Sequence, residues 1–517
     1  MNDWLTTILI FLPVAGALAI WLLPLAERTA GSLALLVALV EVGFWVLALQ
    51  RFEFGEAGLQ LGHEATWSED LNIAYEVGFF GFSLWLVGMA VVVGAAAIAY
   101  AFWAGRDRAR SYFGLTLFLT GAIVGVFTAQ DLLLFYVFFE VMLIPLYVLI
   151  GVWGGPGRLG ATLKFVIYTV AGSLLMLVAI IALGLQQDTF SLTEMRASDN
   201  EWIFLGFVAA FAVKAPLFPL HGWLPDAYRE SPPEIAAVLS GVVSKAAGYG
   251  FLRIAIAEFP GPAKDFQVLL LALAAVGLVY GSLVAFRAPD LRGVIAYSSM
   301  AQMGLVTLGL FALNDAGFDG AVLQMVNHGL LSGALFLLAG TIERRAATGD
   351  FAALGGFARG RPALATVLMT TGIIALAVPG ATTFAAEFLI LLGAFDVGWG
   401  WAAVGVSAVV LAAMYTLRLI SAVLHERPGR AVAEEALDLR PAELGIVVPL
   451  VACLLALSAW PAAVTEHAFA GDRPADAVES RFEAAPNAAS NRLLQGSPAL
   501  AAGPTPRYVV RVTGVDP

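Results

Sequence analysis

The stretch FAVKAPLFPLHGWLPDAYRESPPEIAAVLSGVVSKAAG, residues 211–248, decides how this chain folds. It places Lys214 and Lys245 in two apolar runs on either side of a proline-rich turn. Each run is apolar enough to belong to a membrane helix, where an ammonium group costs about 3 kcal/mol on insertion scales. A charged residue at that depth is a functional candidate by default, so these two lysines anchor the interpretation.

The composition is that of a membrane protein. Of the 517 residues, 60% are hydrophobic and 13% are charged, and the mean hydropathy is +0.84. Soluble domains carry about 25% charged residues. The single cysteine, Cys453, excludes a disulfide framework and a cysteine-ligated metal or iron–sulfur site. The net charge of −11 offers no basic surface for nucleic acid.

Apolar segments predict an all-α polytopic membrane protein with about fourteen transmembrane helices. A bilayer core of about 30 Å needs about 20 apolar residues per helix. We expect helices 7 and 12 to be broken by their prolines and glycines. The segments are approximately 4–24, 30–50, 78–103, 111–128, 131–153, 162–185, 201–221, 233–257, 266–286, 291–313, 319–342, 363–394, 400–424 and 442–462.

Positive charge indicates the orientation. With the N-terminus outside, the inward loops hold fifteen arginines, and the outward loops hold only Arg51, Arg196 and Lys264. This distribution satisfies the positive-inside rule. We therefore expect both termini outside, an acidic outward loop at 51–77, and a weakly ordered outward tail at 466–517.

Two interruptions suggest internal symmetry. Lys214 precedes Pro216 in segment seven, and Pro379 precedes Glu387 in segment twelve, five helices later. Matching interruptions favour two inverted five-helix repeats, helices 4–8 and 9–13. The predicted divisions are helices 1–3 (1–110), the first repeat (111–258), the second repeat (266–425), helix 14 (442–462) and the tail (466–517).

Glu140 and Lys214 are candidates for proton transfer. Glu140 is the only charged residue between Asp131 and Arg158, and Lys214 is its expected partner. A static ion pair that fixes helix packing is the alternative for Glu140. Lys214 lies where the helix breaks, so water can reach it. Its alternative, snorkelling to the interface, fits a mid-span position poorly.

Three further residues extend this candidate path. Lys245 lies halfway along segment eight with Ser240 and Ser244 nearby. His328 shares a helix face with Gln324 and Ser332, and imidazole both accepts and donates a proton near neutrality. The alternative for His328 is a packing role. Lys164 lies near the inward end of segment six, where snorkelling competes with proton transfer.

Glu387 is the only ionisable residue between Arg361 and Asp396, and Arg418 is its expected charge partner. Arg418 can instead extend to the inward interface. Four residues of segment ten can hold water between His328 and the lysines, or they can bond neighbouring helices together. They are Tyr297, Ser298, Ser299 and Gln302.

The turn after segment seven carries several polar side chains that can form a cytoplasmic proton uptake site. The alternative is a capped turn, in which Ser231-Pro-Pro-Glu234 resembles a capping box that starts segment eight. The residues are His221, Asp226, Tyr228, Arg229 and Glu234.

These motifs together resemble a known family. KAPLFPLHGWLPDAYRESPPE (214–234), LSGVVSKAAGYGFLR (239–253), LRGVIAYSSMAQMG (291–304), QMVNHGLLSGALFLLAGTIERR (324–345) and FFEVMLIPLYVLIGVWGG (138–155) are similar to the antiporter-like subunits of respiratory complex I. The resemblance covers about residues 80–460. Glu387 favours the M type of bacterial NADH–quinone oxidoreductase, equivalent to mitochondrial chain 4, because related L, N and Mrp subunits have a lysine there.

The resemblance implies fourteen helices with inverted repeats and a hydrophilic axis through Glu140, Lys214, Lys245, His328 and Glu387. It also shows departures. Gln302 stands where the family has a histidine, VPGATTF (378–384) replaces LPGxxGF, and Tyr228 stands where a histidine is frequent. Because glutamine cannot titrate, the link across segment ten must rely on water or on His328.

The expected function is proton translocation by a membrane-arm subunit of NADH–quinone oxidoreductase in a bacterial inner membrane. FMN, iron–sulfur clusters and quinone are expected in other subunits, and no cofactor or metal in this chain. Its partners would be neighbouring antiporter-like subunits and the lipid bilayer. The alternatives are an Mrp-type cation/proton antiporter subunit, the equivalent subunit of a membrane-bound hydrogenase, or a structural spacer in which the buried charges only hold the membrane arm together.

Overall fold

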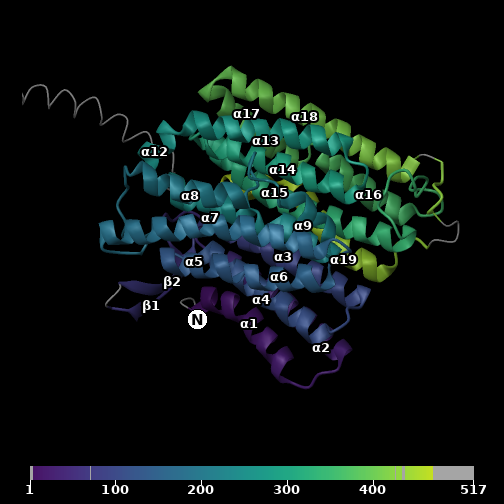
Figure 1. Cartoon of the computed structure of the whole chain (residues 1–517), viewed down its shortest axis with the longest axis horizontal. Coiled ribbons are helices and arrows are strands. Elements are labelled where there is room, and N and C mark those ends of the chain that lie inside the picture. The colour runs from purple at the N-terminus through teal and green to yellow at the C-terminus, as the bar shows by residue number, and fades with distance from the viewer. Residues whose placement is uncertain (1–3, 70–71, 426, 433–436, 470–517) are drawn as a thin grey trace, which may run out of the picture.

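The computed structural model describes residues 4–69, 72–425, 427–432 and 437–469, and the chain forms a helical bundle with one β-hairpin (Figure 1). The elements are α1 (Leu5–Leu22), α2 (Glu27–Arg51), β1 (Gln60–Ser68), β2 (Ile73–Phe79), α3 (Gly81–Ala104), α4 (Ala109–Thr128), α5 (Leu132–Val141), α6 (Leu143–Trp153), α7 (Arg158–Gln187), α8 (Glu201–Lys214), α9 (Leu224–Glu230), α10 (Pro233–Val238), η2 (Leu239–Val243), α11 (Lys245–Gly250), η3 (Phe251–Ile256), α12 (Pro260–Asp265), α13 (Gln267–Arg287), α14 (Leu291–Leu310), α15 (Asp315–Ala346), α16 (Pro362–Ala375), α17 (Thr382–Val397), α18 (Trp399–Ile420), η4 (Ser421–His425), α19 (Pro441–Ala459) and α20 (Ala462–Thr465).

The predicted multi-pass helical fold is confirmed. Each of the fourteen predicted segments is largely helical, and in the described part of the chain twelve helices are long and apolar enough to cross a membrane. The two segments outside this set are 201–221 and 363–394, which were predicted to be broken. The count of fourteen crossings, the inverted relation of the repeats and the division of the chain into parts remain predictions.

Both breaks have a local cause. α8 ends at Lys214 because Pro216 and Pro219 cannot donate the backbone hydrogen bonds that would continue the helix. α16 ends at Ala375, and Gly380 then adopts a φ of 98°, a left-handed conformation that glycine tolerates best. Residues 215–217 of the first break are buried, as expected for irregular backbone that protein encloses at membrane depth. Residues 378–380 of the second break are exposed at the surface of the bundle.

A β-hairpin in the acidic loop corrects the all-α prediction. β1 and β2 pair antiparallel, with Glu64 opposite Glu76, and occupy most of the acidic loop predicted at 51–77. The hairpin lies at one end of the bundle, here called the hairpin face, together with the first described residues (Figure 1). The end of the described chain reaches the same face, since Phe82 N donates to Ala468 O at 2.9 Å. The predicted tail lies outside the described residues beyond Phe469.

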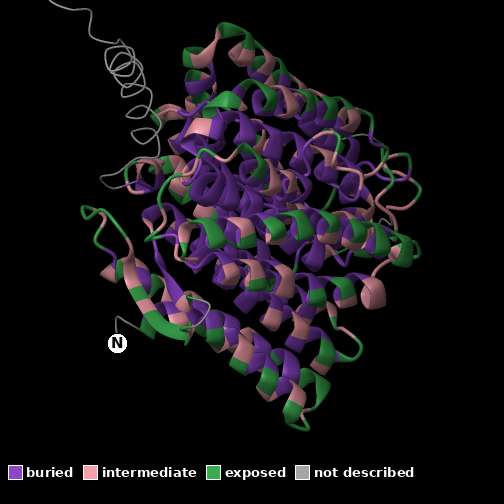
Figure 2. Ribbon diagram, turned by 60° about the vertical axis from the view of Figure 1, so that its left-hand side comes forward, coloured by how far each residue is buried: buried purple, intermediate pink, exposed green. Residues whose placement is uncertain are grey.

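The most buried helices lie in the middle of the bundle (Figure 2). The helical run Pro233–Ile256 and the helix α15 are almost entirely enclosed, whereas α2, α7 and α18 expose a large part of their surfaces. Exposed apolar residues on these outer helices are expected where lipid or a neighbouring subunit covers them. The candidate residues Lys245 and His328 are both on the enclosed helices.

Candidate functional site

Lys214 is buried at the point where α8 ends. Its side chain is 1% exposed, and its Nζ has no hydrogen-bond partner among the described residues. The ammonium lies 4.4 Å from the ring centroid of Phe139 on α5. A desolvated cation over an aromatic face gains about 2 kcal/mol, which only partly offsets its burial. Lys214 Nζ thus lacks oxygen acceptors among the described residues that would stabilise its protonated form.

The expected ion pair between Glu140 and Lys214 is not formed. No ion pair or hydrogen bond joins the two residues, and Glu140 Oε1 has no hydrogen-bond partner within the described chain. Phe139 faces the lysine, and the next residue of an α-helix points about 100° away from it. Glu140 is therefore half-buried on a neighbouring face of α5, and its charge acts on Lys214 without a direct contact between the two side chains.

Lys245 makes direct contact with His328. Its Nζ lies 2.5 Å from His328 Nδ1, 2.7 Å from Ser240 O and 3.1 Å from Ser244 Oγ. The lysine follows the π-helical turn η2, in which Ser244 N donates to Leu239 O five residues earlier. Single π-helical turns inside α-helices are frequent at functional sites. The prediction that the two serines lie near Lys245 is confirmed.

The short Lys245–His328 contact limits the charge of the pair. An ammonium and an imidazolium are both donors without an acceptor, so two charged partners cannot share a hydrogen bond. One of the two must be neutral, and the pair holds at most one unit of positive charge. Both side chains are buried, at 0% and 4% exposure. This arrangement can pass a single proton between the two nitrogens.

Serines surround this pair and join three helices. Ser240 Oγ donates to Ser299 Oγ on α14 at 2.9 Å and lies 2.5 Å from Ser332 Oγ on α15. All three are buried. The predicted polar face of α15 is thereby confirmed at Ser332. Direct bonds between the serines favour the interpretation that Ser299 connects helices.

A chain of amides connects α15 to Glu387. Gln324 Nε2 donates to Gln302 Oε1 at 2.6 Å, and Gln302 Nε2 donates to Glu387 Oε1 at 3.3 Å. Gln324 lies one helical turn before His328 on the same face. Glu387 Oε2 and Gln324 Oε1 lack hydrogen-bond partners in the described residues, although both side chains are buried. Unsatisfied buried oxygens of this kind are positions for water.

Arg418 is not the partner of Glu387. Its Nη1 donates to Phe286 O at 2.6 Å and to Ala288 O at 2.8 Å, at the end of α13. The guanidinium also lies over the rings of Phe286 and Phe351. A basic side chain binds helix-terminal carbonyls favourably because they carry partial negative charge. Arg418 therefore extends to the helix end, which was the alternative, and the predicted pair is wrong.

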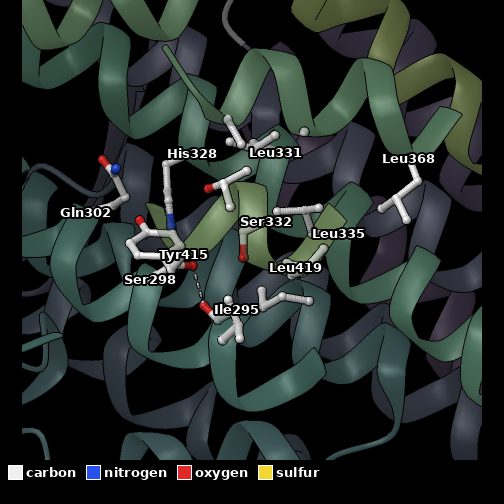
Figure 3. A pocket seen from close by; sticks show the side chains of 14 residues that line it. Ile295, Ser298, Gln302, His328, Leu331, Ser332, Leu335, Leu368, Tyr415 and Leu419 are labelled. Carbon is white, nitrogen blue, oxygen red and sulfur yellow. Dashed lines mark hydrogen bonds between the residues drawn. The ribbon is translucent and has the colours of Figure 1, made fainter. Parts of the chain in front are cut away.

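A cavity of about 40 Å³ opens beside His328 and Gln302. That volume holds about two or three waters. Figure 3 shows His328, Gln302, Ser298 and Tyr415 at one end of the cavity, and Leu335 and Leu368 at the other. Sequence reasoning missed Tyr415, although a tyrosine within an apolar span was a usable signal. Glu387 does not line this cavity but a second one of about 10 Å³, and Gln302 borders both.

Of the predicted proton uptake residues, His221 and Tyr297 lie within electrostatic range of Lys164, but only some of the set are in direct contact. Lys164 pairs with Asp226 at 2.8 Å, with both side chains nearly half exposed. His221 packs against the rings of Phe218 and Tyr280. Lys164 thus extends to an exposed carboxylate, which favours the interpretation that it snorkels to the membrane interface. Tyr297 is half-buried on α14 and is absent from the lining of the His328 cavity.

The predicted capping box at Ser231 is wrong. Glu234 is fully buried and binds Arg106 through both oxygens at 2.7 Å, and it accepts from Tyr112 Oη at 2.5 Å. Ser231 Oγ donates to Ala227 O instead. Proline does occupy the first turn of α10, as predicted. Two further arginine–carboxylate pairs lie at this end of the bundle. Arg229 binds Asp290, and Arg292 binds Glu343.

Comparison with known proteins identifies the family. Residues 129–412, more than half of the chain, match the family described as NADH:quinone oxidoreductase/Mrp antiporter, TM. The chain belongs to this family. The resemblance in the sequence motifs is thereby confirmed.

Relatives and solved structures cover nearly the whole chain. The NADH-quinone oxidoreductase subunit M of Rhodobacter capsulatus is 38% identical over 485 residues, covering 89% of this chain and 94% of that protein. The NAD(P)H-quinone oxidoreductase chain 4 1 of Synechococcus elongatus is 36% identical over 478 residues, covering 90% and 89%. A chain of respiratory complex I from Thermus thermophilus with bound NADH superimposes with a TM-score of 0.82 at 31% identity, covering 92% and 98%. A chain of the Mrp complex from Dietzia shares the fold at 21% identity, with a TM-score of 0.79 and coverage of 90% and 96%.

Proposed function

We propose that this chain is a membrane-arm subunit of an NADH–quinone oxidoreductase and that it translocates protons. Family membership and the subunit M relatives support the assignment to this enzyme. In this proposal the flavin, the iron–sulfur clusters and the quinone belong to other subunits, and this chain carries no redox chemistry. Its neighbours are antiporter-like subunits. The excess of arginine in alternate loops supports a location in the bacterial inner membrane with both termini outside.

The Lys245–His328 contact carries the proposal. A proton on Lys245 Nζ transfers to His328 Nδ1 over 2.5 Å, because only one of the two groups is charged at a time. From His328 the proton moves into water in the adjoining cavity and then past Gln302 to Glu387, which lines a second, smaller cavity. Gln302 orients that water and the carboxyl group by hydrogen bonds but does not itself accept the proton.

Lys214 and Glu140 begin the path in this proposal. Because Lys214 Nζ has no oxygen partner in the described residues, its protonation responds to small changes in nearby charge. Glu140 is only half-buried, so a neighbouring subunit can change its charge or its surroundings. Redox energy released elsewhere then acts on Glu140, alters Lys214, and moves a proton toward Lys245 and His328.

Two experiments test the proposal. The tagged chain, purified gently from its own membranes, should carry flavin, iron–sulfur absorbance and NADH–quinone activity. If it comes only with small membrane proteins and sodium-dependent transport, it is an antiporter subunit instead. In the assembled complex, Lys245→Ala should abolish NADH-driven acidification of vesicles, whereas Lys264→Ala, at an exposed lysine, should not. Normal pumping by the assembled Lys245→Ala complex would exclude the proposed path.

A further inference from the structure

Arg253 is a buried arginine that the proposed proton path does not use. It follows Lys245 on the same helical run, about 12 Å closer to the hairpin face at 1.5 Å per residue. Its Nη1 donates to Glu258 Oε1 at 2.8 Å, its Nη2 to Leu192 O at 2.9 Å, and its Nε to Gln130 Oε1 at 3.2 Å. The guanidinium is therefore held from three directions.

Gln130 connects Arg253 to Tyr249. The amide is fully buried, and its Nε2 lies 3.4 Å from both Tyr249 Oη and Thr128 O. Arginine has donors and no acceptor, so Gln130 must turn its oxygen toward Arg253 and its nitrogen toward Tyr249. Gln130 thus donates to the tyrosine. Tyr249 cannot pass its own proton to a group that presents an N–H.

Aromatic rings surround Tyr249, and a polar cavity lies beyond them. Phe82, Phe127 and Phe135 surround the tyrosine, with ring centroids about 6 Å away. Further toward the hairpin face, a cavity of about 110 Å³ is lined by carboxylates and hydroxyls, including Glu76, Asp131 and Thr193. Asp131 follows Gln130 directly, and Ser191 and Thr193 flank Leu192, whose carbonyl binds Arg253.

We propose that Arg253 seals the first repeat toward the hairpin face by fixing the orientation of the Gln130 amide. Without the seal, a proton on Lys245 would reach Tyr249, one helical turn away, and leave through the polar cavity. Arg253 acts through Gln130 and is a positioning residue. A fixed guanidinium also repels an approaching proton, as charged barriers do in selective pores. This inference rests on the proposed role of Lys245 in carrying protons.

Removing Arg253 frees the amide and leaves space for water between Tyr249 and the cavity. The test uses Arg253→Ala combined with Glu258→Ala, so that no buried carboxylate is left unpaired. Closed vesicles containing the whole complex receive an imposed pH gradient without NADH. The double variant should dissipate the gradient several-fold faster than the wild type, while NADH–quinone activity persists. Vesicles that contain the single variant Glu258→Ala, in which Arg253 still binds Gln130, should keep the pH gradient as long as the wild type does.

Three further variants separate a seal from a structural role. Lysine, like arginine, has only donors, so Arg253→Lys combined with Glu258→Ala should keep the pH gradient at the wild-type level. Adding Tyr249→Phe to Arg253→Ala/Glu258→Ala should slow the loss of the pH gradient to the wild-type rate, because it removes the hydroxyl that carries the proton. Gln130→His leaves the Arg253–Glu258 pair intact, introduces a group that accepts a proton, and should leak.

An unchanged gradient in assembled Arg253→Ala/Glu258→Ala and Gln130→His complexes would overturn the seal, as would a leak that Tyr249→Phe does not suppress. Because the gradient is imposed without turnover, this result is independent of whether Lys245→Ala stops pumping. The loss of an imposed pH gradient therefore tests the seal, whereas NADH-driven acidification tests the proposed function.

Discussion

The backbones of Gly241 and Gly329 touch. A Cβ added at Gly241 would lie 2.8 Å from Gly329 O, and a Cβ at Gly329 would lie 2.8 Å from Gly241 O. Small residues allow membrane helices to approach this closely. Gly329 follows His328, and Gly241 precedes Lys245 by four residues, so this contact sets the separation across which the lysine and the histidine meet.

Gly241→Ala should therefore weaken both stability and pumping. The added methyl group meets backbone, which cannot move aside, and overpacking of this kind costs about 1–3 kcal/mol. The Lys245–His328 distance should increase, and NADH-driven acidification should fall more than NADH–quinone activity. Gly160→Ala on α7 is the control because nothing lies within 4 Å of its Cβ position. Equal behaviour of the two variants would contradict the packing argument.

His328→Gln should stop proton transfer while keeping a hydrogen bond to Lys245. Glutamine has similar bonding groups but does not titrate. We expect pumping to fall about a hundredfold, the lower end of what general acid–base groups contribute. The measurement is the ratio of protons moved to NADH oxidised in assembled complexes. If His328→Gln pumps normally, the imidazole serves only in packing.

Gln302 offers a test of the water connection. Gln302→Leu removes the bonds to Gln324 and Glu387 and should impair pumping, since the water beside His328 loses its orientation. Gln302→His should retain or raise pumping because imidazole both accepts and donates. Both variants are compared at equal assembly by vesicle acidification. A Gln302→Leu complex that pumps like the wild type would remove Gln302 from the path.

Glu140→Gln should leave assembly intact. Breaking a buried ion pair costs about 3–5 kcal/mol, but Glu140 forms no such pair with Lys214 here. We expect a normal amount of complex with reduced coupling between NADH oxidation and pumping. Native gel electrophoresis and vesicle acidification distinguish these outcomes. Loss of the assembled complex would favour a structural role for Glu140.

Asp438 caps α16 from a distant part of the chain. Its carboxylate accepts from Ala363 N at 2.8 Å and Leu364 N at 2.9 Å. Burial raises the pKa of Asp438, but these N–H groups, Leu439 N–H and the charge of Arg345 outweigh burial and hold the pKa below its usual value. A lowered pKa stabilises the fold at pH above the unfolded value of about 3.9 and ceases to do so as pH falls through the folded value.

Asp438→Asn should accordingly destabilise the protein by about 1 kcal/mol at pH 7, the usual effect of losing a helix cap. The difference from the wild type should begin to shrink below about pH 4, where Asp438 of the unfolded chain becomes protonated, and should vanish at lower pH, once the folded carboxyl group is protonated as well. Thermal unfolding of the purified complex at both pH values measures this. A difference that does not change with pH would show that the charge of Asp438 is irrelevant.

The candidate site could be predicted residue by residue but not pair by pair. Lys214, Lys245, His328 and Glu387 are conspicuous because charged groups are costly in apolar segments. The serines beside Lys245 were predicted correctly, but the expected charge pairs were not. Arg418 binds carbonyls at the end of α13 instead of Glu387. Sequence spacing gives the face of a helix, but which helix meets that face depends on packing across the whole bundle.

The sequence by itself determined that the chain crosses a membrane many times, where its helices lie, and where two of them break. These features follow from apolar length and from proline and glycine, which act locally. Only the tertiary structure decided that Lys245 meets His328, that Gln302 bridges Gln324 and Glu387, and that Arg253 fixes Gln130. Hydrogen bonds act over about 3 Å between segments that are far apart in the chain, so they depend on how the helices finally pack.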